Sequence, residues 1–184
     1  MGGGTAMMLQ IDHRDSNDID IFLADAQQLS FLDPQKRDFD FDIRPSDYTG
    51  DGSRFLKLGF EMGEIDFIVA RALTSSPTMQ ATVDGETTLL ETIPEIIAKK
   101  VYYRGARIAP RDIFDIAAGS ETQADSIIEA LRAYRDEVAQ ALIAIEKQNP
   151  DFVNAAISQL RIKPPYLTIA KAAIEKAKEV LGAV

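Results

Sequence analysis

The sequence has 184 residues, of which 46% are hydrophobic and 27% are charged, a balance typical of a globular protein. No apolar run reaches the length of a membrane-spanning helix and no secretion signal opens the chain, so we expect a cytoplasmic protein. The absence of cysteine excludes disulfides and thiolate metal sites. A single histidine, His13, excludes metal sites built from several histidines.

The net charge is -9, which by itself argues against a nucleic-acid-binding protein. All of the excess negative charge lies in residues 1–90, whereas residues 91–184 are balanced. Residues 96–111 contain no acid and carry the cations Lys99, Lys100, Arg104, Arg107 and Arg111. An acidic half beside a basic cluster suits a site that holds divalent metal together with polyphosphate, although a solvated helix face explains these charges equally well.

The first half of the chain is predicted to consist mainly of short strands. Residues 17–23 alternate, with Ile19 and Ile21 on one face of a strand and Asp18 and Asp20 on the other. We also expect a short helix over 6–11, a loop over 33–53 with one edge strand at 39–42, a hairpin over 54–70 with its turn near 62–64, and a strand over 79–83.

After Pro94 the pattern changes to that of helices. Helices are predicted over residues 95–104, 111–118, 121–147, 152–161 and 166–181. The sequence therefore predicts an α+β fold. A small mixed sheet in residues 1–92 precedes a helical part in residues 93–184, which completes the active-site cleft.

Asp18, Asp20 and Asp66 are candidate metal ligands. Two carboxylates at positions i and i+2 of a strand project from one face and repel each other unless a cation lies between them. Hard oxygen ligands of this kind suit Mg²⁺. Asp66 lies in the strongly apolar segment 65–69, where burying an acid without a partner is costly, and binding the same metal would supply a partner. Solvent-facing positions are the alternative for each of the three acids.

Residues that could bind phosphate stand on either side of these acids. Gly3 and Gly4 precede a short helix, where glycines let backbone N–H groups approach a phosphate, although a glycine-rich terminus is often only flexible. Lys100 shares the apolar stripe of its predicted helix, where a bound phosphate, an acidic partner or snorkelling to solvent would each explain a lysine. Asp112 and Asp115 share a face of the next helix and could orient Lys100 or form a separate ion pair.

These residues together match a known pattern. The order Gly-Gly-Thr-Ala, His-Arg and Ser-x-Asp-x-Asp resembles the signature of the AbiEii-type nucleotidyltransferase toxin family. Here it stands as Gly3-Gly4-Thr5-Ala6, His13-Arg14, Ser16, Asp18 and Asp20. A second block is similar in Lys100, Arg104 and Arg111-Asp112-x-x-Asp115. The family carries a helical segment before the Gly-Gly pair, whereas this sequence begins almost on it, as a shortened variant or a truncated start would.

The resemblance implies a nucleotidyltransferase fold, with a mixed sheet, flanking helices and a C-terminal helical part, that uses an NTP and Mg²⁺. In a two-metal mechanism Asp18 and Asp20 would hold both ions. Asp66 would hold the ion that activates the attacking hydroxyl.

The other residues of the pattern would bind the nucleotide. Gly3, Gly4, Thr5 and Ser16 are expected to contact the triphosphate. Lys100, together with Arg104, would stabilise charge on the phosphates in the transition state. Asp112 would orient Lys100 or assist the acceptor.

Toxins of this family are paired with an antitoxin encoded beside them, and some members add nucleotides to the acceptor end of tRNA. The expected partners are therefore an NTP, a tRNA acceptor and a cognate antitoxin. Two alternatives stay open, namely transfer of a nucleotide to a protein hydroxyl and an inactive, truncated chain that only binds a partner. The intact Asp18, Asp20 and Asp66 favour an enzyme over the inactive chain.

Overall fold

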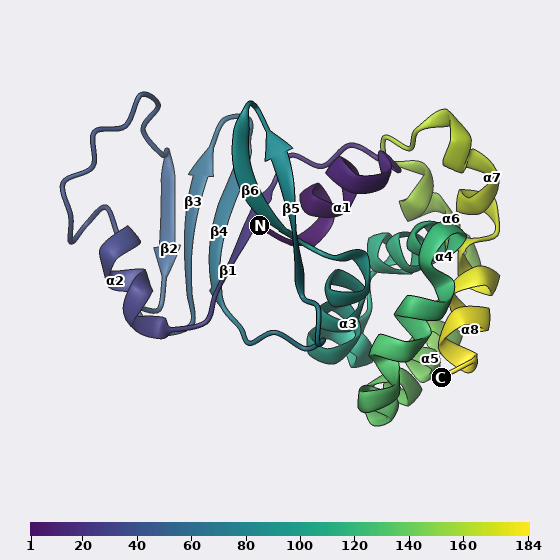
Figure 1. The fold of residues 1–184 in the computed structure, drawn as a ribbon. Coiled ribbons are helices and arrows are strands. Elements are labelled where there is room, and N and C mark those ends of the chain that lie inside the picture. The colour runs from purple at the N-terminus through teal and green to yellow at the C-terminus, as the bar shows by residue number, and fades with distance from the viewer.

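The computed structural model describes residues 1–184, and its first part is built on a four-stranded sheet. The strands follow the order β1 (Ile19–Leu23), β4 (Gly63–Val69), β3 (Phe55–Phe60) and β2 (Asp47–Gly50). β1 pairs with β4 in parallel, and the two other pairs are antiparallel. Figure 1 shows β2 at the outer edge of the sheet and β1 at the edge nearest the helices. The predicted α+β class with a small mixed sheet is confirmed.

The two faces of this sheet differ in chemistry. Side chains at directly paired positions share a face, so the register places Asp20, Asp66 and Lys57 on the same face. On the opposite face Leu56 and Leu58 are buried against the start of α2 (Leu29–Leu32). Because α2 covers the apolar face, the charged face remains for the functional site.

A second sheet and the first helix adjoin the β1 edge. β5 (Thr78–Val83) and β6 (Glu86–Glu91) form a separate hairpin, and α1 (Gly3–Ile11) lies beside it (Figure 1). The backbone N–H of Gly2 donates to the carbonyl of Asp20 at 2.8 Å, and the N–H of Glu91 donates to the carbonyl of Met1 at 2.8 Å. The segment that leads into α1 is therefore tied to both β1 and β6.

The second part of the chain is helical. Its helices are α3 (Ile93–Arg104), α4 (Pro110–Leu131), α5 (Arg135–Lys147), α6 (Pro150–Ser158), α7 (Leu167–Lys171) and α8 (Ala173–Gly182). No helix combines the length and the apolarity that crossing a bilayer requires. In Figure 1 these helices gather on one side, next to α1 and away from β2.

One hydrophobic core joins α1 and β6 of the first part to the helical part, while the four-stranded sheet has a separate small core. Ala6 and Met7 of α1 and Leu90 of β6 belong to the same buried cluster as Phe114 of α4 and Leu181 of α8. The core therefore crosses the boundary that we predicted between residues 92 and 93.

The strands differ from the prediction at two places. Residues 39–42 form no strand, and the edge strand is β2, eight residues further on. Tyr48 of β2 packs on the small apolar core of the sheet, whereas the alternating Phe39 and Phe41 contact each other and have no ladder partner. The polar strand β6 was not predicted, because only its pairing with β5 and the burial of Leu90 distinguish it from a loop.

The helix boundaries predicted near residue 120 differ from those of the structure. α4 spans Pro110–Leu131 with a kink at Gln123, three residues beyond the predicted break, and Gly119 packs closely against Ile93 and Met7 before that kink. The predicted single helix over 121–147 is instead interrupted by the 3-10 turn Arg132–Tyr134, and Gln123 has a non-helical backbone with φ -137°.

Candidate active site

Two of the three predicted metal ligands lie on β1 and β4, and the third, Asp18, lies just before β1. Asp20 stands directly beside Asp66 in the parallel register. Asp18 precedes β1 and accepts a hydrogen bond from the backbone N–H of Glu64, at 3.3 Å, on its Oδ1. The structure thus brings together two acids that are separated by 46 residues in the sequence.

This acidic pair is electrostatically unfavourable as it stands. Burial raises the pKa of Asp20 above its ordinary value, and the charge of Asp66 raises it further. Burial likewise raises the pKa of Asp66, although Lys57 opposes the rise. Both shifts mean that the site disfavours two bare negative charges, which is the condition that a bound cation relieves.

The glycine turn lies directly against Asp20. Gly3 has a left-handed backbone with φ +63°, and a β-carbon at this position would collide with the Asp20 carboxylate. At Gly4 an added β-carbon would come within 2.7 Å of Arg14 Nη2 and 3.0 Å of Ser16 Oγ. Only glycine therefore lets the start of α1 approach the acids so closely.

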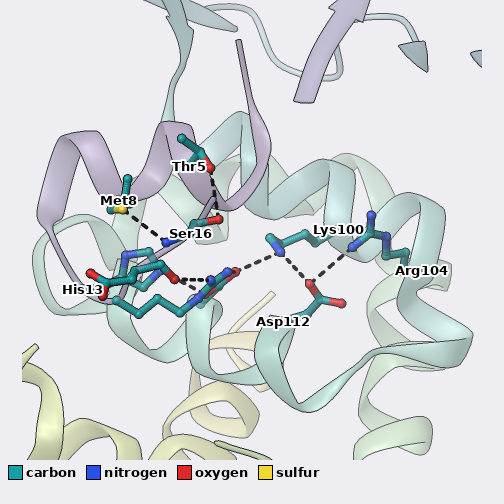
Figure 2. Close-up of polar contacts among 10 residues, drawn as sticks. Thr5, Met8, His13, Ser16, Lys100, Arg104 and Asp112 are labelled. Carbon is teal, nitrogen blue, oxygen red and sulfur yellow. Dashed lines mark hydrogen bonds and ion pairs between the residues drawn. The ribbon is translucent and has the colours of Figure 1, made fainter. Parts of the chain in front are cut away.

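The remaining residues of the predicted triphosphate site lie around the same turn. The Thr5 hydroxyl donates to the carbonyl of Asp18 and contacts Ser16 Oγ at 3.0 Å (Figure 2). The backbone N–H of Ser16 points to the sulfur of Met8 at 3.3 Å, also drawn in Figure 2. Gly3, Gly4, Thr5 and Ser16 are thus neighbours, beside the carboxylates.

Lys100 points from α3 toward two acids of α4. Its Nζ lies 2.5 Å from Asp112 Oδ1 and 2.9 Å from Asp115 Oδ2, and its side chain is buried (Figure 2). Burial opposes the charge, but the two carboxylates outweigh it and raise the pKa of Lys100 above its ordinary value. Arg104, half exposed, lies 3.6 Å from Asp112. The sequence left open whether the two acids orient Lys100 or form a separate ion pair. In the structure both acids form ion pairs with Lys100 itself.

Asp115 has a larger role than the sequence indicated. It is fully buried and accepts from His13 Nε2 at 3.0 Å and from Arg14 Nε and Nη2 at 2.8 and 3.0 Å, in addition to Lys100. Burial alone would raise the pKa of Asp115, but these cations and donors hold it well below its ordinary value. The adjacent His13-Arg14 pair in the sequence was the available signal, since two such residues beside a metal motif need an acidic partner.

The charge pattern indicated a single basic cluster at residues 96–111, but the structure does not gather these residues on one surface. Lys99 is buried, forms ion pairs with Glu91 and Glu95, and lies 3.8 Å from the centre of the Phe22 ring. Glu95 in turn accepts hydrogen bonds from the backbone of residues 73–74. With Lys99 and Lys100 enclosed in separate networks, only the three arginines of the cluster are exposed.

The donor set suits a divalent cation, but the site is not assembled for one. No three acidic or histidine side chains converge on a point where an ion would be held. The available donors are carboxylate oxygens, which Mg²⁺ prefers. Asp66 Oδ1 is buried without any hydrogen-bond partner, as expected for an oxygen that has a ligand still to bind. The residues present therefore fit a hard cation, provided that side chains shift.

Comparison with known proteins identifies the family of the chain. Residues 1–178 match the family described as nucleotidyl transferase AbiEii toxin, of type IV toxin–antitoxin systems. The chain therefore belongs to the AbiEii nucleotidyltransferase toxin family, and the resemblance drawn from its motifs is confirmed. No curated protein matched the sequence.

Proposed function

We propose that the protein is a Mg²⁺-dependent nucleotidyltransferase that transfers a nucleotide from an NTP to the end of an RNA, with tRNA as the acceptor. Its place in a toxin–antitoxin family suggests that a cognate antitoxin restrains it. The observation that carries the proposal is the pairing of Asp20 with Asp66 beside the glycine turn.

The chemistry is the attack of an acceptor hydroxyl oxygen on the α-phosphorus of the NTP. The bond to the β-phosphate breaks, pyrophosphate leaves, and the hydroxyl proton passes to a nearby base. Magnesium ions held by Asp18, Asp20 and Asp66 would neutralise the triphosphate and lower the pKa of the acceptor hydroxyl. Asp66, whose pKa is raised by burial, would also accept that proton.

The neighbouring residues orient the nucleotide. Backbone N–H groups at the start of α1, near Gly3 and Gly4, offer hydrogen bonds to phosphate oxygens. Thr5 holds the turn through its hydrogen bond to the carbonyl of Asp18, and Ser16 adds a hydroxyl donor. Lys100 supplies positive charge that Asp112 and Asp115 hold in place, and the half-exposed Arg104 is free to reach a phosphate.

A second candidate is transfer of the nucleotide to a protein hydroxyl. Burial of Lys99 and Lys100 removes two of the five cations that would have guided RNA to this site, and the chain carries a net charge of -9. Loss of such phosphate contacts weakens the case for RNA, because phosphate contacts dominate RNA affinity. A protein acceptor does not require cationic contacts to a phosphate backbone.

One experiment separates the two candidates. The purified chain is incubated with each labelled NTP, Mg²⁺, total tRNA and a cell extract as a source of proteins, beside an Asp18→Ala/Asp20→Ala control. Label in RNA that requires both carboxylates supports the tRNA acceptor and names the nucleotide. Label in a protein band supports the second candidate. Absence of label from both would contradict the enzyme and favour a chain that only binds a partner.

A further inference from the structure

Lys57 contacts the acidic site directly, although no sequence motif included it. It lies on β3, opposite Asp66 of β4 in the antiparallel register. Its Nζ is 3.3 Å from Asp66 Oδ2 and also forms an ion pair with Glu64. The Lys57 side chain is 34% exposed and is therefore in contact with solvent.

The two oxygens of Asp66 have different surroundings. Oδ2 faces Lys57, whereas Oδ1 is buried and has no partner. Asp66 shares a sheet face with Asp20, yet the acids of the site do not converge on a single point. Lys57 thus pairs with the carboxylate that the proposed metal site requires from β4.

We propose that Lys57 is the counter-ion of Asp66 in the metal-free site, and that a divalent cation must take Asp66 from it. Lys57 then keeps Glu64 as its partner, so the exchange breaks one ion pair and leaves no charge stranded. This inference rests on the proposed function, because it takes Asp66 as a ligand of the catalytic cation.

The exchange makes Lys57 a competitor of the metal. A lysine beside Asp66 both occupies a ligand oxygen and repels an incoming cation. Removing the lysine should therefore strengthen cation binding, which is the opposite of what removing a ligand or a structural residue does. Glu64 acts in the other direction, because it draws Lys57 away from Asp66.

The test is titration of Mn²⁺ alone into the full-length chain, with free Mn²⁺ followed by electron paramagnetic resonance. Loss of one positive charge at this distance should make the Kd of Lys57→Met about tenfold lower than that of the wild type. Lys57→Arg keeps the charge and the competition, so its Kd should stay close to the wild-type value. Asp18→Asn/Asp20→Asn marks the loss of the site.

Two further variants separate contact from a general effect of charge. Arg104→Met removes a cation of the same site that contacts Asp112 and not Asp66, so it should leave the Mn²⁺ Kd much less changed than Lys57→Met does. Glu64→Gln should weaken Mn²⁺ binding when Lys57 is present. In the Lys57→Met background the same change should have a smaller effect, since no lysine remains to be drawn away.

The outcomes distinguish this inference from the proposed function. If labelled nucleotide is transferred but Lys57→Met binds Mn²⁺ no more tightly than wild type, the competition is refuted while the enzyme stands. An equal decrease in the Mn²⁺ Kd of Lys57→Met and Arg104→Met would also overturn the inference, because it would show a general electrostatic effect of removing a positive charge. Wild-type protein that binds no Mn²⁺ would overturn both the inference and the proposed metal site.

Discussion

At the scale of single residues, Asp115 is the centre of the largest buried charge network. Three basic side chains, His13, Arg14 and Lys100, meet on one carboxylate that has no solvent exposure. Burying these charges is costly, and Asp115 is the common partner that offsets the cost. The network also joins the segment after α1 to α3 and α4, and so holds Lys100 toward the candidate site.

Replacing Asp115 by Asn should destabilise the protein by about 3–5 kcal/mol near neutral pH, because Arg14 and Lys100 then lose a buried charge partner. Urea unfolding measures the change. Since the pKa of Asp115 is depressed on folding, its contribution is complete above its unfolded pKa and is lost as the pH falls through the folded value. The deficit of the variant should therefore shrink below about pH 4. A deficit that stays constant far below that pH would contradict the network.

Asp20 should behave in the opposite way. Its pKa is raised on folding, so the ionised carboxylate costs stability above that pKa. We expect Asp20→Asn, measured in EDTA at pH 7, to be more stable than wild type by about 1 kcal/mol and to have no transferase activity. The gain should vanish as the pH falls and Asp20 becomes protonated. Asp42→Asn, at an exposed loop position, is the control for a general loss of charge.

At the scale of elements, the start of α1 depends on how closely it approaches β1. Gly3 and Gly52 have similar left-handed backbones, with φ +63° and +73°. They differ in space, because a β-carbon at Gly3 would strike the Asp20 carboxylate while one at Gly52 would meet nothing within 4 Å. Substitutions at these two glycines therefore separate the effect of backbone strain from the effect of the contact with Asp20.

Gly52→Ala should cost only the backbone strain, about 1–2 kcal/mol, and leave nucleotide transfer unchanged. Gly3→Ala should cost more than this and abolish transfer, because Asp20 must move away from the turn. Thermal unfolding and the labelled-NTP assay measure the two effects. Equal loss of stability in both variants, with activity retained in Gly3→Ala, would show that the close approach has no function.

Buried charged side chains connect α3 to β6 and to the segment after β4. Lys99 of α3 joins Glu91 of β6, and Glu95 holds the backbone at residues 73–74. A β-carbon at Gly2 would strike Glu91 and the Phe22 ring, so this network also lies against the segment that leads into the glycine turn. Lys99 therefore belongs to the support of the site and is not a residue for contacting RNA.

At the scale of the whole molecule, the core that spans α1, β6 and the helices should make the chain unfold as one unit. Far-ultraviolet and near-ultraviolet circular dichroism should report the same transition temperature. A chain ending at residue 92 should not fold, because Ala6, Met7 and Leu90 would lose the helices that bury them. Two separate transitions, or a folded fragment 1–92, would show instead that the strands and the helices are independent domains.

Some local features of the candidate site could be predicted from the sequence, because their signals lie within single segments. Alternation along a strand places Asp18 and Asp20 on the face opposite Ile19 and Ile21 without reference to any other segment. The motif order likewise identified the family, and the helical spacing placed Lys100 toward the interior, where the structure has it.

The remaining features depend on contacts between distant segments. Whether Lys57 stands opposite Asp66 is decided by the register of β3 against β4, and a shift of one residue would place it on the other face. Lys99 and Lys100 are adjacent in the sequence but enter different networks, because Lys99 meets Glu91 of β6 whereas Lys100 meets Asp112 of α4. The sequence by itself determined the residue types and their local faces. Only the tertiary structure decided which charges are paired, because the energy of a buried charge depends on the partners that packing brings to it.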